Sequence, residues 1–92
     1  MPDTDEIAKI VLPDPALIRP LLTAREVEVM LAWFASDSKN SAALTLYLSV
    51  GTINTHLLRI RAKYSDVGRP ASTKTSLFVR ALQDGYTTLD QW

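Results

Sequence analysis

The chain has 92 residues, of which 47% are hydrophobic and 22% are charged, a composition typical of one globular domain rather than a disordered or fibrous protein. It contains no cysteine, which excludes a disulfide scaffold, a thiolate nucleophile and a zinc site built on sulfur. No apolar run approaches the about 20 residues that a membrane-spanning helix needs, and the acidic start MPDTDEIAKI lacks a signal-peptide pattern, so we expect a cytoplasmic protein with no membrane partner.

Charge is segregated along the chain, although the net charge is zero. Residues 1–20 carry four acids and two bases, a net charge of −2, whereas residues 36–80 carry seven bases and two acids, a net charge of +5. Such segregation indicates an anionic partner for the middle of the chain. An ordinary solvated surface accounts for the charges equally well, so the helices and motifs have to decide between these alternatives.

The first twenty residues have the composition of an arm. They contain four of the five prolines, and proline removes a backbone donor and blocks regular pairing. We therefore expect a linker or arm over residues 1–20, with a short helical turn near residues 5–11. A folded domain is expected over residues 21–92.

Two helices are predicted in the first half of this domain. Thr23-Ala24-Arg25-Glu26 forms a capping box. The apolar residues that follow it have the spacing of an amphipathic helix and are Val27, Met30, Leu31 and Phe34. The polar residues 36–38 interrupt this helix, and a short second helix is expected over residues 39–46. Trp33 and Phe34 are expected to lie in the core.

The third predicted helix, over residues 50–65, has one narrow apolar stripe and an opposite face suited to a groove. Ser49 is a good N-cap for it. The residues of the stripe fall within about 60° of the helix circumference; they are Ile53, Leu57, Ile60 and Tyr64. The opposite face is small at its centre and polar or cationic at its edges, and no acid occurs between residues 49 and 64. A solvated helix usually carries both signs of charge, so this face favours an anionic groove.

A fourth helix is expected over residues 72–84, with Gly85 as its stop. Its apolar residues cover about 200° of the circumference, whereas one core contact needs about half of that arc; they are Leu77, Phe78, Val79, Ala81 and Leu82. With Leu77 and Ala81 directed inward, the surplus has two interpretations. It either contacts the C-terminal residues Tyr86, Leu89 and Trp92 or forms a subunit interface, whose residues would be Thr75, Val79 and Leu82.

A short helix, a tight turn at residues 47–48 and a groove-suited helix together make a helix-turn-helix. Three segments, LTAREVEVM at 22–30, LYLSVGTINTHL at 46–57 and IRAKY at 60–64, resemble the LuxR-type (GerE/NarL-like) domain. Its pattern reads roughly LTxRExEVL, followed by LxxSxxTVxxHxxxIxxKL. The resemblance covers about residues 21–86, and the segments IRAKYSDVGRPASTK and ALQDG are also similar to the output domains of actinobacterial response regulators. It implies an all-α, four-helix DNA-binding domain that dimerises through its last helix, here with a Pro-rich N-terminal arm.

The resemblance also implies roles for individual residues. Asn54, Thr55 and Leu58 match positions that reach base edges in the major groove, and Gly51 matches a further contact position. Asn54 can pair with adenine, while Leu58 and the Thr55 methyl group can contact thymine methyl groups, which favours A·T-biased half-sites. Phosphate contacts are expected from residues that match backbone-proximal positions or carry positive charge in this region. They are Lys39, Thr52, Arg59, Arg61, Lys63 and Arg69.

No catalytic or metal site is predicted. His56 is the single histidine and has no second ligand nearby, so a packing role or a phosphate contact is expected for it. Thr23 and Ser49 are helix caps, because neither has a general base at a plausible spacing. We therefore expect a protein that is not an enzyme and uses no cofactor.

Two functions from different classes remain. The first is sequence-specific binding of double-stranded DNA by a homodimeric transcriptional regulator, as the output domain of a two-component response regulator. The second is a helical protein-interaction module that contacts a sigma factor or RNA polymerase. The cationic third helix favours the first, whereas the neutral net charge and the wide apolar fourth helix leave the second open.

Overall fold

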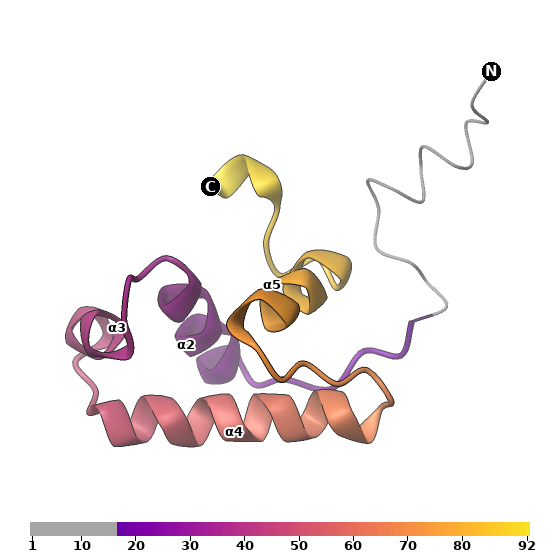
Figure 1. Ribbon diagram of the computed structural model, residues 1–92, viewed down its shortest axis with the longest axis horizontal. Coiled ribbons are helices and arrows are strands. Elements are labelled where there is room, and N and C mark those ends of the chain that lie inside the picture. The colour runs from indigo at the N-terminus through magenta and orange to yellow at the C-terminus, as the bar shows by residue number, and fades with distance from the viewer. Residues whose placement is uncertain (1–16) are drawn as a thin grey trace.

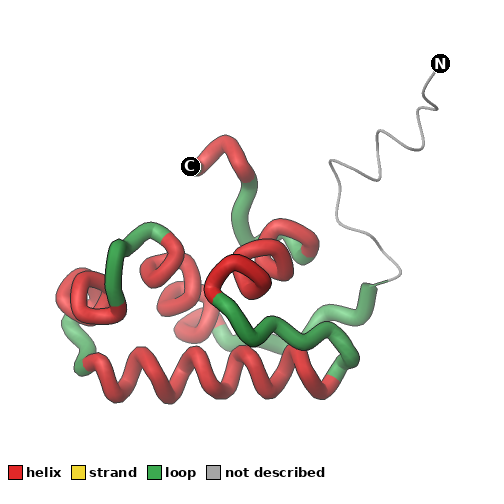
Figure 2. Tube along the Cα trace, viewed as in Figure 1, coloured by secondary structure: helices red, strands yellow, loops and turns green. Residues whose placement is uncertain are grey.

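The structure is a computed structural model that describes residues 17–92, and over that range it is all-helical (Figure 1; Figure 2). Its helices are α2 (Ala24–Phe34), α3 (Lys39–Leu46), α4 (Val50–Asp66) and α5 (Lys74–Gln83), followed by a 3-10 turn at Leu89–Gln91. No strand occurs in residues 17–92, and the all-α fold class is confirmed. α3, α4 and α5 begin and end within two residues of their predicted ranges, and α2 begins directly after Thr23, the predicted capping residue. The helical turn expected near residues 5–11 lies outside the described residues.

Each of these helices begins at a side-chain hydroxyl. Thr23 Oγ1 accepts from the Glu26 amide at 3.0 Å, and Glu26 Oε1 accepts from the Thr23 amide at 2.8 Å, which is the predicted capping box. Ser38, Ser49 and Thr73 accept in the same way at the starts of α3, α4 and α5. These bonds satisfy amides that have no partner inside the helix, so the caps fix where each helix starts.

Three helices end in a left-handed residue: Tyr47 after α3 (φ 57°), Gly68 after α4 (φ 75°) and Gly85 after α5 (φ 79°). At the end of α5, the Gly85 amide donates to the Leu82 carbonyl at 3.2 Å, and the Tyr86 amide donates to the Ala81 carbonyl at 2.9 Å. This pair of bonds is the Schellman motif, so the prediction that Gly85 stops the helix is confirmed.

The core lies between α4 and the helices on one side of it. Figure 1 shows α4 along one edge of the molecule, with α2, α3 and α5 all on the same side. The predicted stripe of α4 is buried: Ile53, Leu57, Ile60 and Tyr64 are at most 1% exposed. Trp33 is also buried, whereas Phe34 is half-buried and packs against the core from outside.

Some of the apolar residues of α5 that do not face the core pack against other parts of the chain. Leu77 and Ala81 are fully buried, as predicted. Phe78 stacks edge-on between Phe34, with ring centroids 5.2 Å apart, and Trp92, at 5.5 Å. The predicted contact with the C-terminal segment therefore exists, but it does not cover all of α5, because Val79 is still 40% exposed.

Candidate nucleic-acid interface

The face of α4 that points away from the other helices is exposed along its whole length (Figure 1). The exposed residues lie within an arc of about 120° opposite the buried stripe. They are Gly51, Thr55, Leu58, Arg59, Ala62, Ser65 and Asp66. The one acid among them, Asp66, lies in the last turn, so the first four turns present a ridge with no negative charge.

The four residues predicted to contact bases lie on or beside this ridge. Gly51, Thr55 and Leu58 are exposed, with Leu58 at 67%, and Asn54 is half-buried at the edge of the ridge. The Thr55 hydroxyl donates to the Gly51 carbonyl at 3.0 Å, so its methyl group is the part left for an outside contact. A Cβ added at Gly51 would lie 3.8 Å from Ser49 Oγ, an ordinary van der Waals distance, so packing does not require glycine here. Glycine instead keeps the ridge low at its amino end.

Two of the predicted phosphate contacts have cationic groups with no ion pair or cation–π contact within residues 17–92. Arg59 is exposed and Lys39 is half-buried, and neither forms an ion pair within residues 17–92. Thr52 is half-buried, and its Oγ1 lies 2.9 Å from Ser49 Oγ at the start of α4. Arg61 is half-buried, with its guanidinium 5.6 Å from the centroid of the Trp33 ring, where the cation is attracted to the ring face.

Lys63 is less available than its position on α4 suggests. Its Nζ donates to Glu26 Oε1 at 2.6 Å and to the Leu21 carbonyl at 3.0 Å. Glu26 is only 3% exposed. Burial disfavours its charged form, but the hydrogen bonds from Lys63 and Thr23 and the charge of Lys63 outweigh burial and hold the pKa of Glu26 below its ordinary value. One N–H of the Lys63 ammonium is left for a phosphate. The ammonium cannot move away to offer more, because that would leave the buried Glu26 carboxylate without its counter-charge.

The lowered pKa of Glu26 predicts acid-sensitive stability. A carboxyl group with a depressed pKa stabilises the folded state above its unfolded pKa, and this contribution is lost as the pH falls through the folded value. We expect Glu26→Gln to be destabilising at pH 7 and less so at pH 3, because the unfolded parent carboxyl is protonated there and the folded one gains its proton as the pH falls through its depressed pKa. Urea denaturation of both proteins at pH 7 and pH 3 measures this. A stability difference that stays the same at both values would contradict the charged pairing with Lys63.

The position of Arg69 contradicts the prediction that this residue contacts a DNA phosphate. It is 7% exposed, and its guanidinium binds Asp84 through Nη2–Oδ1 at 2.9 Å and Nη1–Oδ2 at 3.1 Å. Tyr64 donates its hydroxyl to the same carboxylate at 2.7 Å, and burial together with this bond raises the pKa of Tyr64. Arg69 also donates to the Ile18 carbonyl at 2.8 Å. A guanidinium enclosed in this way cannot reach a DNA phosphate, so Arg69 is a structural residue.

The predicted boundary at residue 20 does not coincide with a break in contacts. The carbonyls of Ile18 and Leu21 accept hydrogen bonds from Arg69 and Lys63, respectively, and Pro20 is buried against the domain. The last residues of the predicted arm are therefore part of the folded body.

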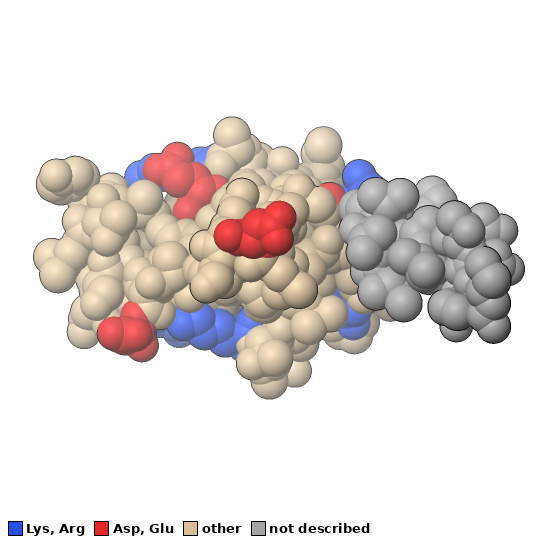
Figure 3. Space-filling view, turned by 90° about the horizontal axis from the view of Figure 1, so that it is seen from above, with Lys and Arg blue, Asp and Glu red and all other residues tan. Residues whose placement is uncertain are grey.

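The face opposite α4 carries both signs of charge. Figure 3 looks onto the face opposite α4, where small groups of acids and bases are separated by wide uncharged areas. His56, on the flank of α4, is half-buried, and its Nδ1 is buried without a hydrogen-bond partner. Residues 17–92 contain no group of three His, Cys, Asp or Glu side chains able to hold a metal ion.

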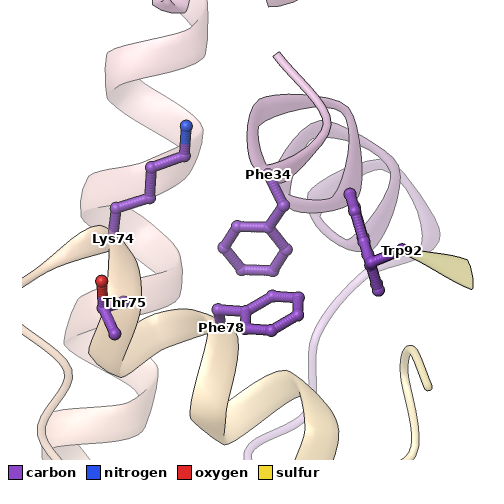
Figure 4. A pocket seen from close by; sticks show the side chains of 5 residues that line it. All are labelled: Phe34, Lys74, Thr75, Phe78 and Trp92. Carbon is purple, nitrogen blue, oxygen red and sulfur yellow. The ribbon is translucent and has the colours of Figure 1, made fainter. Parts of the chain in front are cut away.

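The outer side of α5 combines exposed residues with an open apolar pocket. Thr75 and Val79 are exposed, and Leu82 is half-buried. The pocket has a volume of about 250 Å³ and is lined by Phe34, Lys74, Thr75, Phe78 and Trp92. Figure 4 shows the rings of Phe34 and Phe78 next to each other in the pocket, with Trp92 beside them. The cation at its rim is already used, since Lys74 Nζ donates to the Ser36 carbonyl at 2.9 Å.

Comparisons of the chain with protein-family models, curated proteins and solved structures find no match. None of the helices in residues 17–92 has the length and hydropathy needed to cross a membrane. The functional argument therefore rests on the α4 ridge and its surroundings.

Proposed function

We propose that the chain binds double-stranded DNA in a sequence-specific manner, with α4 in the major groove. The observation that carries the proposal is the α4 ridge, which is fully exposed, uncharged at its centre and free of acids from Ser49 to Tyr64. A helix of 17 residues is about 25 Å long, and the major groove, about 12 Å wide, admits one α-helix. Burial of the opposite stripe makes this ridge the part of α4 able to enter the groove.

The pairing of α3 with α4 supports a helix-turn-helix. α3 ends at Leu46, α4 begins at Val50, and the two are joined by the left-handed turn at Tyr47 and the Ser49 cap. This arrangement, together with the resemblance to the LuxR-type domain, supports a role as the DNA-binding output of a transcriptional regulator, with a two-component response regulator as the parent class.

Base reading and backbone positioning fall to different residues in this proposal. Asn54, Thr55 and Leu58 read bases from the ridge, with Gly51 permitting close approach at its amino end. The phosphate contacts come from Lys39, Thr52, Arg59 and Arg61, with Lys63 offering its one spare N–H. Arg69 is excluded because it is buried against Asp84.

The proposal is tested by selecting bound sequences from random duplex DNA at a stated salt concentration. The enriched sequence is called the selected duplex below. We expect log affinity to fall linearly with log salt, with a slope of about 0.9 for each phosphate contacted. Failure to enrich any sequence and to bind any duplex at low salt would contradict the proposal.

Arg59→Ala is expected to weaken binding to all duplexes alike and to reduce the salt slope by about one, because Arg59 is an exposed cation beside the ridge. Fluorescence anisotropy titrations at several salt concentrations measure the slope. Arg25→Ala is the matched control, since Arg25 is already paired with Glu28 at 2.7 Å on α2. An equal loss of slope in both variants would place the DNA elsewhere on the surface.

A homodimer on DNA is proposed through the outer side of α5, formed by Thr75, Val79 and Leu82. Val79→Asp places a charge opposite its own copy across a two-fold axis while leaving Leu77 and Ala81 buried. We expect a folded variant by circular dichroism that loses cooperative binding to an inverted repeat with half-sites about 34 Å apart but keeps weak half-site binding. Full-site affinity equal to that of the parent would mean that the copies meet on another surface or that one copy acts alone.

A second candidate function is contact with RNA polymerase or a sigma factor. It is favoured by two large exposed hydrophobic residues near the end of α3: Leu44 is 78% exposed and Tyr47 is 97% exposed. Neither lies on the α4 ridge. A variant with Leu44→Ser and Tyr47→Asn that retains DNA affinity but loses polymerase recruitment would support this contact, and unchanged recruitment would remove it.

A further inference from the structure

Residues 17–21 form a short segment, here called the strap, that runs into the start of α2. The strap contains no helix, and its backbone carbonyls accept hydrogen bonds from two cationic side chains of the domain. Arg69, just after α4, donates to the Ile18 carbonyl at 2.8 Å, and Lys63, on α4, donates to the Leu21 carbonyl at 3.0 Å. The buried ring of Pro20 lies between these two attachment points in the chain. Figure 1 shows this stretch passing along the carboxyl half of α4.

Both cations are also bound to buried carboxylates that hold helices together. Lys63 joins α4 to Glu26 of α2, which is 3% exposed, at 2.6 Å. Arg69 joins the end of α4 to Asp84 at the end of α5, and Tyr64 of α4 donates to the same carboxylate. The strap carbonyls therefore accept hydrogen bonds from the same two cations that fix α4 against α2 and α5.

Release of the strap would leave Arg69, which is only 7% exposed, short of an acceptor in a buried setting. Arg69 already has one nitrogen, Nε, that is buried without a partner. Losing the Ile18 carbonyl would add a second unsatisfied donor, and such groups are costly when water cannot reach them. The guanidinium would then shift or admit water, and the junction between α4 and α5 would loosen.

We propose that strap docking stiffens the junction of α4 with α5 and thereby raises the affinity for a full DNA site. This inference rests on the proposed function, because a full site requires two α4 helices whose spacing is set by α5. Coupling of this kind is reciprocal, so bound DNA also holds the strap more firmly. The position of residues that precede the strap would then control DNA affinity without contact with DNA.

The test uses the full chain with Pro20→Gly, which removes a buried ring and adds backbone freedom to the strap. Leu21→Ala is the matched control, because the Leu21 side chain is 90% exposed and the substitution keeps the carbonyl that Lys63 binds. Three quantities are measured: backbone order parameters of residues 17–21, amide exchange at the end of α5, and affinity for the selected duplex.

In the parent and in Leu21→Ala we expect strap order parameters near the rigid value of about 0.85, and in Pro20→Gly values below about 0.6. Pro20→Gly should also exchange the Asp84 and Tyr86 amides faster and bind the full site about fivefold more weakly, the lower end of ordinary coupling. A second variant, Lys63→Met, should mobilise the strap in the same way, because it removes the donor to Leu21.

The outcomes separate this inference from the proposed function. A mobile strap in Pro20→Gly with unchanged amide exchange at the end of α5, or with parental affinity for the full site, overturns the inference while leaving DNA binding intact. A strap that stays rigid in both variants also overturns it. If the parent binds no duplex at all, the proposed function fails, and the coupling to DNA fails with it, whereas the exchange rates still decide whether the strap stiffens α5.

Discussion

Replacing Asp84 by alanine is expected to lower the free energy of unfolding by about 3–5 kcal/mol, because it leaves the buried Arg69 guanidinium without its counter-charge. Asp84 is 6% exposed and is bound by Arg69 at 2.9 Å and by the Tyr64 hydroxyl at 2.7 Å. Urea denaturation followed by circular dichroism measures the change.

Two control variants make this result specific. Tyr64→Phe removes only one hydrogen bond to the carboxylate and should cost less, about 1.5–3 kcal/mol, as expected for a bond to a charged group. Asp90→Ala changes an exposed carboxylate in the 3-10 turn and should stay within about 0.5 kcal/mol. A loss in Asp84→Ala no greater than that in Asp90→Ala would show that the buried pair does not support the fold.

Asn54→Ala is expected to cost about 1–3 kcal/mol in binding to the selected duplex and to relax the preference at one base pair. The salt slope should be nearly unchanged, because the amide contributes no charge. Anisotropy titrations with the selected duplex and with single-base variants of it measure both quantities. Asn40→Ala, which removes the same amide from an exposed position on α3, should leave base preference unaltered. A silent Asn54→Ala would mean that α4 is oriented differently from the proposal.

The helices were predictable because their signals are local. Thr23, Ser38, Ser49 and Thr73 accept from amides three residues ahead, and Gly85 supplies the left-handed residue that ends α5. The apolar spacing of Ile53, Leu57 and Ile60 likewise fixes the buried side of α4, and hence its exposed ridge. Such features depend on residues within one or two turns of each other, so a single sequence contains them.

The roles of Lys63 and Arg69 were not predictable in the same way. Their carboxylate partners, Glu26 and Asp84, lie 37 and 15 residues away, and no periodicity links a cation to a distant acid. The positive charge of Arg69 near α4 predicts a phosphate contact, and Lys63 in addition matches a backbone-proximal position of the LuxR-type pattern. The structure shows that Arg69 is buried against Asp84 and that Lys63 already donates to Glu26 and Leu21. The other basic residues near α4 are therefore the main proposed contacts to the DNA backbone.

The packing of the strap was missed for a related reason. The four prolines of residues 1–20 indicate an arm, and Pro20 is unfavourable inside a helix, but the same residues are compatible with an extended segment bound to the domain. What binds the strap is its backbone carbonyls, which are identical in every sequence. Only the placement of Arg69 and Lys63 beside Ile18 and Leu21 reveals the contact.

The central claim, that the α4 ridge enters duplex DNA, is tested most directly by titrating the selected duplex into isotopically labelled protein and mapping amide shift changes residue by residue. The account predicts changes concentrated at the start of α4 and along its exposed face, at Gly51, Asn54, Thr55 and Leu58, with small changes on the face opposite α4. Changes centred instead on Leu44, Tyr47 or the outer side of α5, with the α4 ridge unaffected, would contradict it.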